Sequence, residues 1–119
     1  MPLLISLKKE KVINMMNEIS VDELKEMLDQ QEDFQLVDVR EPHEYEAANI
    51  NGELIPLQTI PQNIDKIDKN KKVVVMCRSG KRSANAIQYL QSQGFKDLHN
   101  LEGGILAWKA EIDNSLDVE

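Results

Sequence analysis

The single cysteine of this 119-residue chain, Cys77, begins its most chemically suggestive segment, CRSGKRS at residues 77–83. An apolar run typical of a buried strand precedes the segment, and a helical pattern follows it. Backbone N–H groups in such a turn form a concave anion site, and the helix N-terminus adds partial positive charge. Arg78, Lys81 and Arg82 add three cations without any acid. We therefore predict a lowered pKa for Cys77 and an exposed thiolate that attacks anionic substrates.

The alternative interpretation is that Cys77 is a packed core residue beside a solvated basic loop, as most lone cysteines are. Its place at the end of a strand, and a basic segment in an acidic protein, favour the functional interpretation. Gly80 is expected to adopt a backbone shape that a Cβ would block. With one cysteine, the chain has no intramolecular disulfide and no thiolate-rich zinc site. We expect a reducing, cytoplasmic setting and neither metal nor cofactor.

Short apolar strands alternate with helices along the chain. Ser20 and Glu23 form a capping box, which predicts a helix from Val21. Gly94 is expected to end a later helix in a left-handed cap. The predicted strands cover residues 34–39, 54–57, 73–76 and 95–101, and the predicted helices cover 21–28, 60–67, 83–93 and 105–112, with a short helical turn in 41–50.

This alternation predicts an α/β fold with a central parallel sheet and helices on both faces. In such folds ligands bind at the carboxyl ends of the strands, where Asp38 and Arg40 would lie beside the Cys77 loop. One hypothesis is that Asp38 and Arg40, with Glu41, orient Arg82 or the loop. The other is a plain ion pair that ties this segment to the fold.

Composition indicates one ordinary globular domain. Apolar residues make up 41% and charged residues 29%, which excludes collagen-like, coiled-coil and wholly disordered chains. The net charge of −7 argues against nucleic acid or anionic membrane as partners, and no apolar run reaches the roughly 20 residues that span a bilayer.

We divide the chain into a loosely held lead-in at 1–16, a domain at 17–113 and a frayed acidic tail at 114–119. The lead-in has its lysines after its apolar run, which is the reverse of a secretory signal. A packed N-terminal strand or helix is the alternative there. Met15 is an alternative translation start to Met1.

Four blocks, in order, resemble a single-domain rhodanese, which is a sulfurtransferase family. They are LVDVREPHEY at residues 36–45, the turn from Asn51-Gly52 to IPL at 55–57, CRSGKRS at 77–83 and LEGGILAW at 101–108. The resemblance covers residues 18 to about 112. It departs from the family pattern at Ala48 and Asn49, where Gly-His is frequent, and at Asn51, where proline is common; we expect these positions to affect local packing alone.

The resemblance implies that Cys77 takes the outer sulfur of thiosulfate as a persulfide, and that a thiophilic acceptor then removes it. The donor would be thiosulfate or a protein persulfide, and the acceptor cyanide, a small thiol or a protein thiol. Substrate would bind at Arg78, Ser79, Gly80, Lys81 and Arg82, supported by Asp38, Arg40 and Ser83. Arg78 and Lys81 are the candidates to hold the sulfonate, whereas Arg82 is expected to pair with a carboxylate and fix the loop.

Three other functions stay open. A cysteine-loop phosphatase or arsenate reductase needs a loop one residue longer than the four residues between Cys77 and Arg82. A non-enzymatic rhodanese-like interaction module often lacks the cysteine that is present here. A persulfide carrier would take sulfur from a protein donor and barely use thiosulfate.

Overall fold

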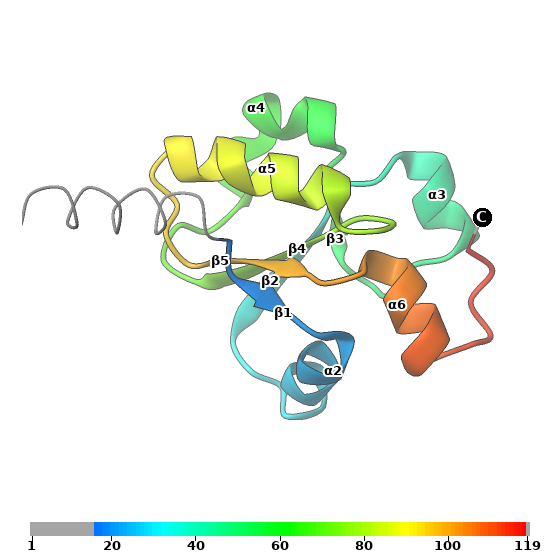
Figure 1. The fold of residues 1–119 in the computed structure, drawn as a ribbon. Coiled ribbons are helices and arrows are strands. Elements are labelled where there is room, and N and C mark those ends of the chain that lie inside the picture. The colour runs from blue at the N-terminus through cyan, green and yellow to red at the C-terminus, as the bar shows by residue number, and fades with distance from the viewer. Residues whose placement is uncertain (1–15, 119) are drawn as a thin grey trace, which may run out of the picture.

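The computed structural model describes residues 16–118, whose centre is a five-stranded parallel sheet with the strand order β1-β5-β4-β2-β3 (Figure 1). Neighbouring strands are parallel at every pairing. The central strand β4 precedes Cys77, so the predicted nucleophile lies at the carboxyl end of the best-buried strand. The strands are β1 (Glu18–Ile19), β2 (Phe34–Asp38), β3 (Glu53–Leu54), β4 (Lys72–Met76) and β5 (Leu98–Leu101).

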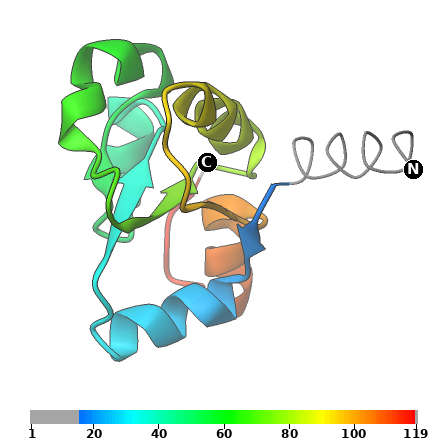
Figure 2. The same ribbon diagram turned by 90° about the vertical axis from the view of Figure 1, so that its left-hand side faces the viewer.

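Helices cover both faces of the sheet, as the two views in Figures 1 and 2 show. Side chains of β4 alternate between two cores: Val73 and Val75 face one, and Val74 and Met76 face the other. The predicted α/β fold is therefore confirmed. One face carries α4 (Ile60–Asn63) and α5 (Lys81–Ser92), the other carries α2 (Val21–Asp29) and α6 (Gly104–Glu111), and α3 (Pro42–Ala47) follows β2.

The capping box at the start of α2 is confirmed. The Ser20 hydroxyl oxygen accepts from the Glu23 N–H at 3.1 Å, and the Glu23 carboxylate accepts from the Ser20 N–H at 3.2 Å. These bonds satisfy donors that the first turn of a helix leaves unpaired. Gly94 also takes the predicted left-handed conformation, with φ of +93°.

Several element bounds differ from the prediction. The edge strand β1 was missed because two residues are too few to show a period, and only its pairing with β5 reveals it. The strand expected from residue 95 begins at Leu98, and the helix expected from Ser83 begins at Lys81. The segment expected as one helix at 60–67 consists of α4 and a 3₁₀ turn, Ile64–Lys66, and another such turn, Leu57–Thr59, precedes it.

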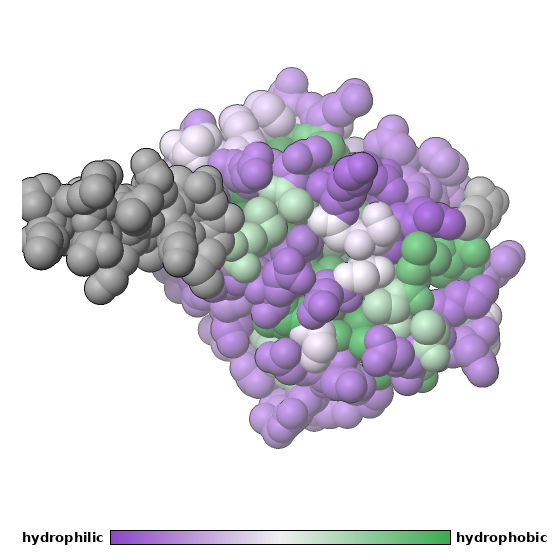
Figure 3. All heavy atoms as spheres, viewed as in Figure 1, coloured by the Kyte–Doolittle hydropathy of each residue, from purple (hydrophilic) through white to green (hydrophobic). Residues whose placement is uncertain are grey.

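The two chain ends differ in what the structure describes. The predicted lead-in lies outside the described residues, apart from Met16, which packs against the core beside α5. The acidic tail is predicted to fray; in its described part, Leu116 and Val118 are partly buried and pack against the core beside α6. No helix within residues 16–118 has the length and apolar character needed to cross a membrane. The face in Figure 3 is mostly hydrophilic, with small apolar areas near α6.

Candidate active site

Cys77 lies between β4 and α5 in a loop of only three further residues, Arg78 to Gly80. Gly80 occupies the position before the first turn of α5 with φ of +105°, a left-handed conformation that favours glycine. This backbone shape directs the Gly80 N–H at Cys77 Sγ, 3.0 Å away. The short loop therefore wraps its own backbone around the sulfur.

The pKa of Cys77 is lowered, as the sequence predicts, but by a different balance of causes. Burial raises the pKa, and hydrogen bonds from the Ser83 hydroxyl and from the backbone N–H groups of Ser83, Gly80 and Ser79 outweigh that effect. The predicted exposure is wrong, because the Cys77 side chain is only 1% exposed and packs in the core beside α5. Hydrogen bonding rather than the nearby cations is thus the main source of thiolate stabilisation.

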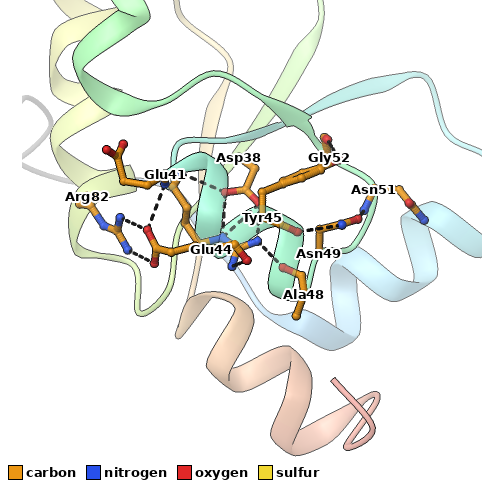
Figure 4. Close-up of polar contacts among 10 residues, drawn as sticks. Asp38, Glu41, Glu44, Tyr45, Ala48, Asn49, Asn51, Gly52 and Arg82 are labelled. Atoms are coloured by element: carbon orange, nitrogen blue, oxygen red, sulfur yellow. Dashed lines mark hydrogen bonds and ion pairs between the residues drawn. The ribbon is translucent and has the colours of Figure 1, made fainter. Parts of the chain in front are cut away.

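The side chains of the loop divide into two groups. Arg78, Ser79 and Lys81 are exposed, whereas Arg82 is half-buried and turns to α3. The Arg82 guanidinium donates from Nη1 and Nη2 to Oε1 and Oε2 of Glu44, at 2.6 and 2.8 Å (Figure 4). Arg82 therefore pairs with a carboxylate, as expected. Its partner, Glu44, was missed because it lies 38 positions away.

Asp38 and Arg40 form a fully buried ion pair, with Arg40 Nη2 donating to Asp38 Oδ2 at 2.8 Å. Arg40 also donates to the backbone carbonyls of Glu44, at 3.3 Å, and Ala48, at 2.8 Å. The pair therefore ties this segment to the fold, which was the second hypothesis. Neither residue bonds Arg82 directly; their support reaches it through α3 and Glu44.

The turn after α3 explains the departure from the family pattern at Asn51. Asn51 has φ of +67°, and its N–H donates to the Asn49 side-chain oxygen at 3.0 Å (Figure 4). Asparagine tolerates this left-handed conformation, whereas proline is fixed near −65°. The Tyr45 hydroxyl donates to the Gly52 carbonyl at 2.7 Å and holds the turn against α3. The sequence difference is thus accommodated locally.

The N-terminus of α6 docks directly on the Cys77 loop. Ile105 N–H donates to the Cys77 carbonyl at 3.0 Å, and Leu106 N–H donates to the Arg78 carbonyl at 3.1 Å. Gly104 makes this approach possible, because a Cβ there would lie 2.4 Å from both carbonyl oxygens. The two-glycine motif at Gly103-Gly104 therefore serves the site as well as the fold.

A hollow of about 210 Å³ lies beside the loop. Its lining combines the exposed Arg78 with polar side chains of α3 and the end of the described tail. It is large enough for a small anion or the end of a thiol acceptor. The lining residues are Arg40, His43, Glu44, Ala47, Arg78 and Val118.

The Arg82–Glu44 pair predicts a pH-dependent contribution to stability. The hydrogen bond from Arg82 is the main cause that lowers the Glu44 pKa from 4.5 to about 2. Because the folded pKa is depressed, the contribution is present above the unfolded pKa of 4.5 and is lost as pH falls toward 2. Glu44→Gln should lower the free energy of unfolding by about 1 kcal/mol at neutral pH, because the pair is partly exposed.

Urea denaturation of wild type and Glu44→Gln, at neutral pH and near pH 3, measures this difference. The gap between the two proteins should shrink in acid. Asp29→Asn is the matched control, because it breaks the exposed Lys25–Asp29 pair and should cost less than about 0.5 kcal/mol. A gap for Glu44→Gln that stays constant with pH would show that the ion pair contributes nothing.

Comparison with known proteins agrees with this architecture. Residues 20–111 match the rhodanese-like domain family. A relative from Bacillus subtilis, named putative sulfurtransferase YtwF, is 43% identical over 79% of this chain and 91% of its own length. Thiosulfate sulfurtransferase GlpE of Pseudoalteromonas translucida is 31% identical over 83% and 94%. A rhodanese-like domain protein from Staphylococcus aureus superimposes with a TM-score of 0.75 at 39% identity, covering 87% of this chain and 99% of that one.

The chain therefore belongs to the rhodanese-like domain family, as its four sequence blocks indicate. Relatives named sulfurtransferase support a rhodanese-type sulfurtransferase.

Proposed function

We propose that the protein moves sulfane sulfur from thiosulfate or a persulfide donor to a thiophilic acceptor through a persulfide on Cys77. The observation that carries the proposal is the environment of Sγ. Backbone N–H groups of Ser79, Gly80 and Ser83 converge on it and lower its pKa. Such a cradle stabilises a thiolate before transfer and a persulfide anion after it.

The reaction balances without an added oxidant. The Cys77 thiolate attacks the outer sulfur of thiosulfate, the S–S bond breaks, and sulfite leaves with the bonding electrons. The resulting Cys77 persulfide is then attacked at its terminal sulfur by cyanide or by a thiolate. Cys77 leaves as a thiolate, and the acceptor becomes thiocyanate or a persulfide. The acceptor must come from outside, because the 119 residues hold no second cysteine for an internal disulfide.

Burial of Cys77 adds one requirement to this scheme. Because Cys77 is only 1% exposed, the donor must enter the loop to reach the sulfur, and the loop carries two exposed cations, Arg78 and Lys81. We assign these two cations to the sulfonate of thiosulfate. Ser79 and Gly80 contribute N–H groups, whereas Arg82 holds the loop through Glu44 and is assigned no direct sulfonate contact.

Charge removal at the mouth of the site tests this assignment. Arg78→Gln and Lys81→Gln should each raise the KM for thiosulfate by roughly threefold to tenfold and leave kcat nearly unchanged. The effect should fall as ionic strength rises, because salt screens exposed charges. Initial rates of thiocyanate formation at low and high salt measure it, with the exposed Lys25→Gln as control. Equal effects of all three substitutions would show that Arg78 and Lys81 do not bind the sulfonate.

A phosphatase or arsenate reductase is the second candidate that the loop chemistry raises. Arg82 argues against it, because both of its terminal nitrogens are engaged by Glu44 rather than directed into the loop. The four residues between Cys77 and Arg82 also make a narrower cradle. Displaced groups are costly in phosphoryl transfer, since small misplacements reduce rates about 100-fold.

Paired assays separate the two functions. We expect measurable thiosulfate:cyanide turnover and negligible hydrolysis of p-nitrophenyl phosphate by the same preparation. Inserting one glycine between Gly80 and Lys81 lengthens the loop and should depress sulfur transfer. Robust phosphatase activity that disappears in Cys77→Ser would replace the sulfurtransferase proposal with this rival.

A further inference from the structure

Two buried polar residues, Ser83 and Asn100, extend from Cys77 into the protein, and the proposed sulfur transfer gives Asn100 no role. Ser83 is 0% exposed and Asn100, on β5, is 5% exposed. The Ser83 hydroxyl oxygen lies 3.4 Å from Cys77 Sγ and 2.5 Å from Asn100 Oδ1. The Asn100 amide nitrogen donates to the Gly80 carbonyl at 3.1 Å. Asn100 thus touches both the loop and the residue that touches the sulfur.

Hydrogen-bond chemistry fixes the direction of these contacts. Because Gly80 offers a carbonyl oxygen, Asn100 must present its NH₂ group there and turn Oδ1 to Ser83. A carboxamide oxygen carries no hydrogen, so the hydrogen in the 2.5 Å contact belongs to the Ser83 hydroxyl. A hydroxyl has one hydrogen, and Ser83 therefore has none left for the sulfur. In the thiol state the 3.4 Å contact runs from the Cys77 S–H to the Ser83 oxygen.

We propose that Asn100 is a positioning residue that keeps the Ser83 hydrogen away from Cys77 while the sulfur is a neutral thiol. In that state the Cys77 S–H donates to the Ser83 oxygen, and the Ser83 O–H donates to Asn100 Oδ1. When the sulfur becomes a thiolate or persulfide anion, Ser83 rotates to donate to it, and Asn100 Oδ1 loses its partner. A buried acceptor without a donor is unfavourable, so Asn100 opposes the charged state.

This effect of Asn100 on the charged state sets how reactive Cys77 is, and the inference rests on the proposed sulfur transfer. The intrinsic nucleophilicity of a thiolate falls as its pKa falls, so too strong a cradle gives an abundant but sluggish nucleophile. Three backbone N–H groups already favour the anion at Cys77. Asn100 Oδ1 competes with the anion for a fourth donor, the Ser83 hydroxyl, whose hydrogen bond also lowers the Cys77 pKa. This competition limits the lowering and keeps the sulfur reactive.

A double-mutant cycle isolates this role. Asn100→Leu removes the acceptor for the Ser83 hydrogen and also the bond to the Gly80 carbonyl, whereas Ser83→Ala removes the hydroxyl. Any loosening of the loop by Asn100→Leu occurs in both the Ser83 and the Ala background. The charged pairs Arg82–Glu44 and Asp38–Arg40 stay in place in every variant. The difference between the two backgrounds therefore reports the hydroxyl alone.

The readout is the pH midpoint of Cys77 alkylation by iodoacetamide, which needs no sulfur substrate. Relative to its effect in the Ser83→Ala background, Asn100→Leu should lower the midpoint by about half a pH unit or more, since the freed hydroxyl then donates to the thiolate. Asn100→Asp loses the Gly80 bond but keeps an acceptor, now a carboxylate that holds the Ser83 hydrogen more strongly, so it should raise the midpoint relative to its effect in the Ser83→Ala background.

No difference between backgrounds for Asn100→Leu, or a raised midpoint, overturns the proposal. If Asn100→Leu does not fold, Asn100→Asp decides: a raised midpoint relative to its Ser83→Ala background supports the proposal, and an unchanged or lowered midpoint overturns it. Thiosulfate turnover, measured separately, reports on the proposed function. If wild type shows no thiosulfate turnover but the alkylation midpoints show the expected coupling between Asn100 and Ser83, the proposed sulfur transfer is contradicted and the role of Asn100 is not.

Discussion

Gly104→Ala is expected to destabilise the protein by about 2–5 kcal/mol and to reduce sulfur transfer in the fraction that remains folded. Two costs contribute. Gly104 has φ of +60°, which costs an L-residue about 1–2 kcal/mol. The added Cβ would also lie 2.4 Å from the carbonyl oxygens of Cys77 and Arg78, which are backbone atoms and cannot swing away. The start of α6 must therefore separate from the active-site loop.

Gly94→Ala provides the matched control for this substitution. Gly94 also has a positive φ, of +93°, but the nearest atom to a Cβ added there would be Lys69 Nζ at 3.5 Å, the end of a flexible side chain. It therefore carries the conformational cost without the collision. Urea denaturation of both variants gives the two free energies of unfolding. Equal losses would mean that close approach of α6 to the loop is not what Gly104 provides.

Cys77→Ser is expected to reduce sulfur transfer to cyanide by about 1,000-fold or more, because a serine hydroxyl neither ionises at neutral pH nor forms a persulfide. The fold should remain. The serine oxygen is smaller than sulfur and fits the space that the thiol leaves, and the Gly80 N–H that now reaches Sγ at 3.0 Å gives it a hydrogen-bond partner.

Two measurements accompany the Cys77→Ser assay. Far-ultraviolet circular dichroism and the melting temperature should stay close to those of wild type, which separates lost chemistry from lost structure. Arg78→Gln serves as the activity control, because it changes an exposed cation beside the sulfur and should retain most of kcat. A Cys77→Ser protein that folds and still forms thiocyanate at a substantial rate would contradict the assigned nucleophile.

Local patterns were enough to predict the parts of the fold and site that depend on neighbouring residues. The capping box of α2, the continuous apolar run of β4 and the left-handed Gly94 each arise within a few positions of the chain. The cradle around Cys77 belongs to this group, because the sulfur and its N–H donors lie within seven residues.

The missed features depend on residues brought together by the sheet. Glu44 reaches Arg82 across 38 positions, and Asn100 reaches Ser83 across 17. Neither partner carries a local signal, since one is a helix-surface glutamate and the other a polar residue in a short strand. The burial of Cys77 was missed for the same reason: its side chain belongs to the core beside α5, which gathers distant residues such as Val39 and Ile55, and no local pattern records this.

Intact-mass spectrometry of the reduced protein after incubation with thiosulfate, and separately with a cysteine desulfurase and cysteine, tests the Cys77 persulfide most directly. We expect wild type to gain the mass of one sulfur atom from thiosulfate, to lose it on addition of cyanide, and Cys77→Ser to gain none. Sulfur gained only from the desulfurase would make the protein a carrier that uses a protein donor. No sulfur gained from either donor, or the same gain in Cys77→Ser, would contradict a persulfide on Cys77.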